Sequence, residues 1–272
     1  MRPTLLSVVL LVLASGRMGS GFAPPLATRV LRASVREMAR ARRIIADSES
    51  TRRDLLSLSD VEPDRVSVIH PGINFPYAPD PAAGATFRAT HRLGSGPLLL
   101  QVGQTGFYKN LPGCLRVVAH LRAGGLPVSL VRAGHRLRPE HLELAGRLGI
   151  SEHIRDLGAL DEQGLADLYN AADVLLFPSL YEGFGWPPLE AMASGLPVVC
   201  SRAGSLDEVV GDAALTAEPE DVSGLSNHVA SVLTDPALAA SLRARGMERA
   251  LHFDWDRTAE KFDAVYREVL EG

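Results

Sequence analysis

The sequence lacks several features that would place it in a specialised class of protein. Its 28 basic and 32 acidic residues give a net charge of −4 with histidine neutral, so it has no basic excess of the kind that binds nucleic acid. Hydrophobic residues make up 46% and charged residues 22%, which excludes a disordered chain. The 272 residues can bury a sizeable core in one large domain or two smaller ones.

Cysteine is scarce, and metal-binding patterns are missing. Cys114 and Cys200 are too isolated for a disulfide framework or a zinc site, and we expect both to be buried, inert thiols, as suits a reducing cytoplasm. His135 and His141 lack metal-site spacing. Asp254 precedes a predicted helix and is expected to cap it, although DWD matches the D-x-D pattern of some metal sites. We therefore predict no metal and no cofactor.

Long apolar runs are missing too. Leu5–Ala14 is apolar except for Ser7, which is too short to span a membrane, since a spanning helix needs about 20 residues. With Arg2 before it and small residues after it, the segment resembles a signal peptide. Alternatively, it belongs to a folded domain whose beginning is missing. Nothing downstream looks secreted, so we predict a cytoplasmic chain without a signal peptide.

The first hundred residues are irregular in pattern. Arg29–Leu58 predicts a helix, a short apolar step and a second helix, with Ser48 or Ser50 as its cap. Asp60–Pro97 carries six of the 18 prolines and several glycines, so it is interpreted as a linker or domain boundary.

Beyond Pro97, short apolar runs alternate with helical patterns. Continuous apolar strands alternating with helices predict an α/β fold, in which a doubly wound parallel sheet is covered on both faces. The predicted strands are Pro97–Gly103, Pro127–Gly134, His153–Gly158, Asp173–Ser179, Leu196–Ser201 and Ala214–Ala217. The predicted helices are Leu111–Ala123, Pro139–Leu148, Asp161–Ala171, Pro187–Ala193, Leu206–Val210, Val222–Leu233, Pro236–Leu251 and Trp255–Val269. Ligands of such sheets bind beyond the carboxyl ends of the strands.

The loop after the first of these strands, GQTGFYKN, suits a phosphate group. Gly103 and Gly106 allow a tight turn and a close approach of backbone to ligand. A helix begins near Asn110, and Lys109, one of only two lysines, adds a full positive charge. The loop matches neither the Walker pattern nor the dinucleotide fingerprint, so a glycine turn with a solvated lysine is the alternative.

A second loop carries two carboxylates around a helix start. Glu182 follows a strand, Gly183-Phe184-Gly185 can expose successive backbone N–H groups, and Glu190 lies about one turn into the next helix. A carboxylate there can accept hydrogen bonds from the vicinal hydroxyls of a ribose or sugar.

Several stretches together resemble one family. EGFGWPPLEAMASGLPVV looks like the E-x7-E signature of glycosyltransferase family 4, whose members are retaining enzymes of the two-domain GT-B fold that use nucleotide-sugar donors. VSVIHPGIN resembles the interdomain segment of that family, and LLLQVGQTGFYKNLPGCLRVVAHL its phosphate-loop strand and helix. LYNAADVLLFPSLYEGFG and FDWDRTAEKFDAVYREVL are similar to its approach to the signature and its closing helix.

The resemblance implies roles for particular residues. Glu190 would hold the donor ribose, Glu182 would face the transferred sugar near its anomeric carbon, and Lys109 would neutralise the departing pyrophosphate. The implied catalytic residues are Glu182 and Lys109, and the implied donor-binding residues are Gly103, Gln104, Lys109, Asn110, Gly134, Gly183, Phe184, Gly185 and Glu190. Many family members have an arginine at Gln104 or just before the lysine, where this chain has Tyr108. Arg132 and Arg138 border the next loop and are candidate replacements.

The resemblance also implies an organisation. Residues 1–80 would be a truncated remnant of an N-terminal domain plus the interdomain linker, 81–254 a Rossmann-like nucleotide-sugar domain, and 255–272 a helix returning toward the N-terminal part. A UDP- or GDP-linked sugar would be the donor, and a glycan, a lipid-linked molecule or a small molecule the acceptor. Peripheral association with the inner face of a membrane is an option for lipid-linked acceptors.

Two other functions stay open on the sequence. Because the first domain of the family supplies the acceptor site, the chain could be a non-catalytic donor-binding fragment or subunit that needs a partner chain. A nicotinamide-dependent oxidoreductase would use the same type of sheet, but no glycine fingerprint followed by an acidic residue is present.

Overall fold

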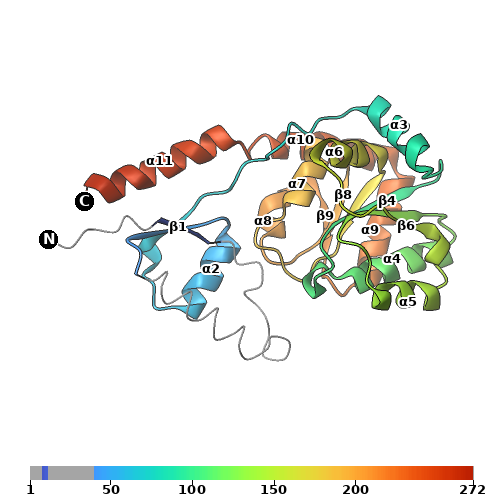
Figure 1. The fold of residues 1–272 in the computed structure, drawn as a ribbon, viewed down its shortest axis with the longest axis horizontal. Helices are drawn as coiled ribbons and strands as arrows, with labels where there is room; N and C mark the ends of the chain where they lie inside the picture. The colour runs from blue at the N-terminus through green and yellow to red at the C-terminus, as the bar shows by residue number, and fades with distance from the viewer. Residues whose placement is uncertain (1–7, 12–39, 272) are drawn as a thin grey trace. The chain divides into compact units, whose positions relative to one another are not determined.

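A computed structural model describes residues 8–11 and 40–271. The chain forms two compact units (Figure 1). Unit 1 contains the residues up to Asn74 together with Tyr181–Phe184 and the residues from Phe253 on, and unit 2 contains Phe75–Leu180 and Gly185–His252.

Unit 2 is built on a six-stranded sheet with the order β6-β5-β4-β7-β8-β9, in which every pairing is parallel. The strands are β4 (Leu98–Gly103), β5 (Ser129–Gly134), β6 (Ile154–Asp156), β7 (Val174–Phe177), β8 (Val198–Ser201) and β9 (Leu215–Ala217). The order reverses between β4 and β7, which places a topological switch point there. The predicted doubly wound parallel sheet is thereby confirmed.

Helices cover both faces of this sheet (Figure 1). On one face α4 packs against α5 and α9, and on the other α3 packs against α6, which is followed by α7 and α8. Their bounds are α3 (Pro81–His91), α4 (Leu111–Ala123), α5 (Pro139–Arg147), α6 (Glu162–Ala171), α7 (Trp186–Ala193), α8 (Leu206–Val210), α9 (Val222–Thr234) and α10 (Pro236–Ala250). Burial on both faces explains why the strands are continuous apolar runs.

The core of unit 2 lies between the sheet and the helices. Leu99, Val174 and Val199, from three neighbouring strands, have no exposed surface, and they pack in one cluster with apolar side chains of α4 and α9. Cys114 belongs to this cluster, and both cysteines are buried. Burial raises the pKa of the Cys114 thiol to about 12, so it stays protonated and inert as predicted.

The division between the two units falls within Asp60–Pro97, at Asn74 and Phe75, as expected of a domain boundary, but much of this segment is not a linker. Pro81–His91 is the helix α3, with the Asp80 carboxylate accepting a hydrogen bond from the Ala83 amide. Pro81 occupies the first helical turn, where no N–H partner is needed, so this proline starts a helix instead of breaking one. Gly84 is buried, and a Cβ atom there would lie 2.3 Å from the Asn170 carbonyl oxygen of α6. Helices α3 and α6 therefore approach closely at this glycine. Close helix packing therefore explains a glycine that resembles a loop residue.

Unit 1 contains a three-stranded parallel sheet in the order β1-β2-β3. The strands are β1 (Val8–Leu11), β2 (Arg43–Ala46) and β3 (Val66–Val68), and the helix α2 (Glu49–Leu58) follows β2. Val8–Leu11 thus lies in a sheet, in agreement with the alternative that this segment belongs to a folded domain. The apolar step before α2 is the strand β2, and Ser48 caps α2 as expected. The helix predicted at the start of Arg29–Leu58 falls mainly outside the described residues.

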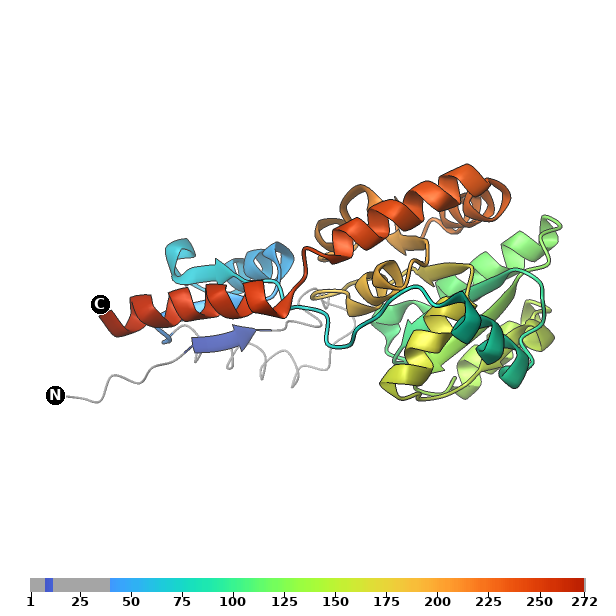
Figure 2. The same cartoon turned by 90° about the horizontal axis from the view of Figure 1, so that it is seen from above.

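Helix α11 (Trp255–Glu271) packs within unit 1, alongside its sheet (Figure 2). Val265 is buried with Ile45 and Ile69, and Arg42 donates a hydrogen bond to the Val269 carbonyl. The Asp254 carboxylate accepts a hydrogen bond of 3.0 Å from the Asp256 amide in the first turn, which is the helix-start role expected of it. None of the helices in the described residues is long and apolar enough to cross a membrane.

Candidate functional site

Two glycines end the neighbouring strands β4 and β5. Gly103 and Gly134 are register partners and have φ angles of +133° and +122°, in the region that favours glycine. A Cβ atom on Gly134 would lie 2.0 Å from the Gly103 carbonyl oxygen. The two predicted residues are therefore brought together, and the absence of side chains leaves backbone at the carboxyl edge of the sheet.

Lys109 stands at this edge. It ends a short 3-10 turn, Phe107–Lys109, and is buried, with 8% of its surface exposed. Its Nζ lies 4.8 Å from the ring centroid of Phe177 at the end of β7, and 5.4 Å from that of Tyr108. A Cβ atom on Gly103 would lie 3.2 Å from the Lys109 Cε, so the glycine leaves room for the lysine stem. Lys109 is thus a largely desolvated cation held against aromatic rings, not the solvated lysine of the alternative interpretation.

Asn110 follows Lys109 and fixes the end of the loop that carries it. Its backbone is left-handed, with φ +49°, and its Oδ1 accepts a hydrogen bond of 3.1 Å from the Gly113 amide in the first turn of α4. Its Nδ2 donates to the carbonyls of Pro178 and Pro219, both at 2.9 Å. The side chain of this predicted donor-binding residue is therefore used to join the β4 loop to the ends of β7 and β9.

Glu190 lies in α7, which begins after Gly185. Gly185 has φ +107°, and a Cβ atom there would lie 2.8 Å from a methyl group of Leu206, so glycine is required at this helix start. Pro187 and Pro188 occupy the first turn, as predicted. The Glu190 Oε2 accepts a hydrogen bond of 2.7 Å from the hydroxyl of Tyr169 in α6.

The surroundings of Glu190 affect its ionisation. Burial raises its pKa, and the negative charge of Glu162 adds to this, whereas the Tyr169 hydrogen bond and the Lys109 cation lower it. A partly buried carboxylate with an oriented oxygen can accept hydrogen bonds from a diol.

Arg132 was predicted as a replacement for the arginine that many family members have near the lysine. The structure contradicts this prediction, because the Arg132 guanidinium is fully engaged with its neighbours. It has no exposed surface, and its guanidinium donates to Gln101 Oε1 at 3.0 Å, to the Gly103 carbonyl at 2.9 Å and to the His135 carbonyl. It also pairs with Asp156 at 3.3 Å. Gln101, Arg132 and Asp156 are register neighbours across β4, β5 and β6, a polar row that the sequence pattern did not reveal.

Arg138 remains a cation of this edge. Its side chain is 55% exposed, and its Nε donates to Thr105 Oγ1 at 3.1 Å, which holds it against the loop after β4. Gln104, the neighbouring residue of that loop, is exposed.

The segment that carries Glu182 lies in unit 1. Glu182 is buried, and the Gly183 carbonyl accepts a hydrogen bond of 2.7 Å from the hydroxyl of Ser48, the cap of α2. The Tyr181 hydroxyl donates to Asp54 of the same helix. The neighbours of Glu182 on both sides, Tyr181 and Gly183, are therefore held by α2 and its cap, a contact between segments far apart in the sequence.

Phe184 ends this segment and is also buried. Its ring lies 6.1 Å from that of His70 and 5.7 Å from that of Phe253, measured between centroids. This aromatic cluster anchors the phenylalanine that precedes Gly185, so its side chain serves packing in unit 1.

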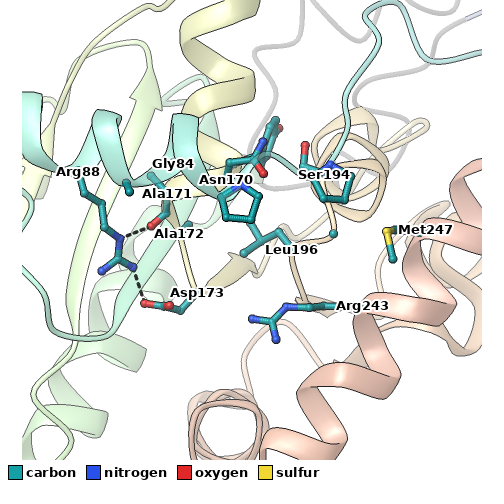
Figure 3. Close-up of a pocket in the computed structure, with 15 residues that line it drawn as sticks. Gly84, Arg88, Asn170, Ala171, Ala172, Asp173, Ser194, Leu196, Arg243 and Met247 are labelled. Atoms are coloured by element: carbon teal, nitrogen blue, oxygen red, sulfur yellow. Dashed lines mark hydrogen bonds and ion pairs between the residues drawn. The ribbon is translucent and has the colours of Figure 1, made fainter.

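A pocket of about 470 Å³ lies elsewhere in unit 2 (Figure 3). Its walls come from α3, from α10 and from the carboxyl ends of α6 and α7, and they include Asp173 and Leu196, which precede β7 and β8. It therefore lies at the amino edge of the sheet, opposite Lys109. Arg88 in its wall pairs with Asp173 at 2.7 Å.

The residues that the structure describes hold no group of three or more His, Cys, Asp or Glu side chains that could bind a metal ion. The chemistry available at the carboxyl edge is thus a buried cation, an oriented carboxylate and glycine backbone, which together suit a phosphorylated sugar or nucleotide.

Comparison with known families shows to which family the chain belongs. Residues 85–249, more than half of the chain, match the profile of the family described as glycosyl transferases group 1. The chain belongs to this family. Residues 16–75 match a second profile, described as glycosyltransferase family 4, part of which lies outside the described residues.

Individual relatives carry related names. The chain is 32% identical over 231 residues to O-antigen chain mannosyltransferase B of Escherichia coli, spanning 84% of this chain and 61% of that protein. It is 33% identical over 271 residues to D-inositol 3-phosphate glycosyltransferase of Thermobispora bispora, spanning 94% of this chain and 62% of that protein. The chain thus spans about six tenths of the length of these curated relatives.

Solved structures share the fold. Sucrose-phosphate synthase from Thermosynechococcus elongatus superposes with a TM-score of 0.78 at 26% identity, over 94% of this chain and 64% of that one. HepE from Anabaena, solved in complex with UDP and glucose, has a TM-score of 0.78 at 19% identity, over 88% of this chain and 68% of that one. The Rossmann-like fold predicted for a GT-B glycosyltransferase is therefore confirmed.

Proposed function

We propose that this chain acts as a glycosyltransferase that takes a sugar from a nucleotide-sugar donor and transfers it to an acceptor hydroxyl with retention of anomeric configuration. Family membership supports the reaction class. The observation that carries the proposal is a buried lysine, Lys109, which stands beside the glycine that ends β4 and over Phe177 at the end of β7. Glu190, oriented by Tyr169, lies in α7, the helix that follows β7.

Lys109 would stabilise the departing nucleoside diphosphate. Breaking the bond between the sugar and the diphosphate leaves negative charge on the phosphate oxygens, and a fixed cation stabilises that charge without reorganising water. Burial against Phe177 and Tyr108 strengthens this interaction because the local dielectric constant is low. The Asn110 cap consumes the Gly113 amide, so the lysine carries more of this task than the amides of the α4 terminus.

Glu190 would hold the ribose of the donor. Its Oε2 is already oriented by Tyr169, and carboxylate oxygens accept hydrogen bonds from vicinal hydroxyls. The family resemblance assigns Glu182 to the transferred sugar. For retention, the acceptor hydroxyl attacks the face that the diphosphate leaves, either directly or through a short-lived oxocarbenium ion, and its proton passes to a leaving phosphate oxygen.

UDP- and GDP-linked sugars are the donor classes that we propose, and glycans, lipid-linked molecules or small molecules the acceptors. The names of the relatives include an O-antigen chain enzyme and an inositol phosphate enzyme, which fit a hydroxyl-bearing acceptor.

Calorimetry with UDP, GDP and their glucose and mannose conjugates tests donor binding, and product analysis with radiolabelled donors tests transfer or donor hydrolysis. Replacing Lys109 by Met is expected to lower turnover about 100-fold or more, the loss typical of removing one preorganised charge-stabilising group. Lys261, the other lysine, lies exposed on α11, and Lys261→Met is the matched control. Glu190→Ala is expected to weaken binding, and Glu182→Gln to slow turnover.

Unchanged turnover in all three site variants would refute the site assignment. Donor binding without any transfer would instead support the non-catalytic donor-binding alternative.

A further inference from the structure

The hydrogen bond that orients the Glu190 carboxylate comes from a buried tyrosine, Tyr169. Tyr169 has no exposed surface, yet its hydroxyl reaches the Glu190 Oε2 at 2.7 Å. A buried phenol hydroxyl needs a hydrogen-bond partner, and its bond to a carboxylate is stronger than one to a neutral group.

The tyrosine is itself fixed by its neighbours. It lies in α6, and its ring meets the ring of Tyr77 edge to face, with centroids 5.6 Å apart and planes at 85°. The adjacent Asn170 donates to the Ala78 carbonyl at 3.0 Å and accepts a hydrogen bond of 2.6 Å from the Asp80 amide. The segment that carries Tyr77 is therefore tied to α6, and Tyr169 has little freedom to leave Glu190.

We propose that Tyr169 is a positioning residue for donor recognition, which locks Glu190 in one rotamer so that its other carboxylate oxygen is presented to the ribose hydroxyls. The inference rests on the proposed function of Glu190. Without the hydroxyl, a glutamate side chain has several rotamers, and ordering it becomes part of the cost of binding.

The hydrogen bond also keeps the carboxylate ionised, which is the form that accepts from a diol. The groups that influence Glu190 are burial itself, Tyr169 and Glu162 from α6, and Lys109 from the β4 loop. Tyr77 also lies within its electrostatic reach, because the Glu190 charge, after burial, raises the pKa of the Tyr77 phenol. Burial and Glu162 raise the pKa of Glu190, whereas Lys109 and the Tyr169 hydrogen bond lower it. Removing the Tyr169 hydroxyl therefore raises the pKa of Glu190 further. On acidification the variant should lose donor affinity at a higher pH than the native chain does.

A double-mutant cycle on the whole chain tests the inference, with UDP as the probe in calorimetry. Tyr169→Phe keeps the ring and removes only the hydroxyl, and we expect it to weaken UDP binding by about two- to tenfold, the cost of ordering one side chain on binding. In a Glu190→Ala background the same change is expected to alter affinity less than about twofold, because a residue that acts through Glu190 has nothing left to position. The acid limb of the affinity profile is expected to move to higher pH in Tyr169→Phe.

Tyr77→Phe is the matched control for a general effect of losing a nearby phenol, since it leaves the bond between Tyr169 and Glu190 in place. Thermal unfolding of each variant shows whether the chain is folded at the titration temperature. Equal weakening by Tyr169→Phe in both backgrounds, or no weakening in the native background, would overturn the inference. If Glu190→Ala leaves UDP affinity unchanged, the proposed role of Glu190 fails, and this outcome is separate because it does not depend on Tyr169.

Discussion

Replacing Asn110 by Ala should destabilise unit 2 far more than removing an ordinary helix cap. Three hydrogen bonds are lost, one from the Gly113 amide and two to the carbonyls of Pro178 and Pro219. Losing a cap costs about 1 kcal/mol, and each of the other bonds contributes roughly 1 kcal/mol net. The left-handed backbone, with φ +49°, adds about 1 kcal/mol for alanine. The expected loss of unfolding free energy is therefore about 3–4 kcal/mol.

Asp221 provides a matched control within the same unit. It caps α9, which has 13 residues like α4, and its carboxylate accepts 2.8 Å from the amide of Gly224, also three residues on. Asp221→Ala removes only a cap, so the expected loss is about 1 kcal/mol. Asn110→Gly should recover about 1 kcal/mol relative to Asn110→Ala, because glycine tolerates the left-handed conformation.

Urea unfolding followed by circular dichroism measures these differences as shifts of the transition midpoint under identical conditions. If Asn110→Ala were no more destabilising than Asp221→Ala, the two carbonyl contacts would contribute nothing, and the described role of Asn110 in joining the β4 loop to β7 and β9 would be wrong.

Two further predictions follow from the site. Gly134→Ala should cost at least about 2 kcal/mol in unfolding free energy, because its Cβ would lie 2.0 Å from the Gly103 carbonyl oxygen at φ +122°. Gly125→Ala, with φ +89° but no atom within 4 Å of the added Cβ, should cost only about 1 kcal/mol in the same urea titration, and equal losses would contradict the close approach. Glu190→Gln should raise the thermal midpoint at neutral pH while weakening UDP binding. The pKa of Glu190 is raised in the folded state, so the native chain loses stability as the pH rises above the ordinary glutamate value of 4.5 and the buried carboxyl ionises. Glutamine cannot ionise, so the gain in stability from Glu190→Gln should disappear below that pH. The measurement is the difference in thermal midpoint between Glu190→Gln and the native chain. If this difference were smaller at neutral pH than at acid pH, the expected direction of the effect would be wrong.

Local sequence patterns were sufficient for most of unit 2. Short, mostly apolar runs between helical patterns predicted every strand of its sheet, because strands buried on both faces need continuous apolar side chains. Helix starts with Asp or Asn caps were equally visible, as at Asp161, whose carboxylate accepts from the Gly164 amide. Helix α3 was missed because Pro81 and Gly84 suggest a loop, whereas one begins the helix and the other allows its packing against α6.

The candidate site shows the same division. The residue types and spacings around Lys109 and Glu190 are properties of the sequence, since a glycine loop, a lysine and a carboxylate must follow particular strands to meet at one edge. The hydrogen bond from Tyr169 to Glu190 joins residues 21 positions apart, and the bond from Ser48 to the Gly183 carbonyl joins residues 135 apart. No local period encodes such pairs.

The sequence by itself thus determined the parallel α/β class, the loops that carry the candidate chemistry and the family resemblance, because these depend on periodicity and local motifs. Only the tertiary structure decided that Arg132 is buried and fully engaged while Lys109 stands over Phe177, and that Asn110 serves the fold through its side chain. The reason is physical: the burial and the partners of a polar side chain depend on which strands and loops pack beside it.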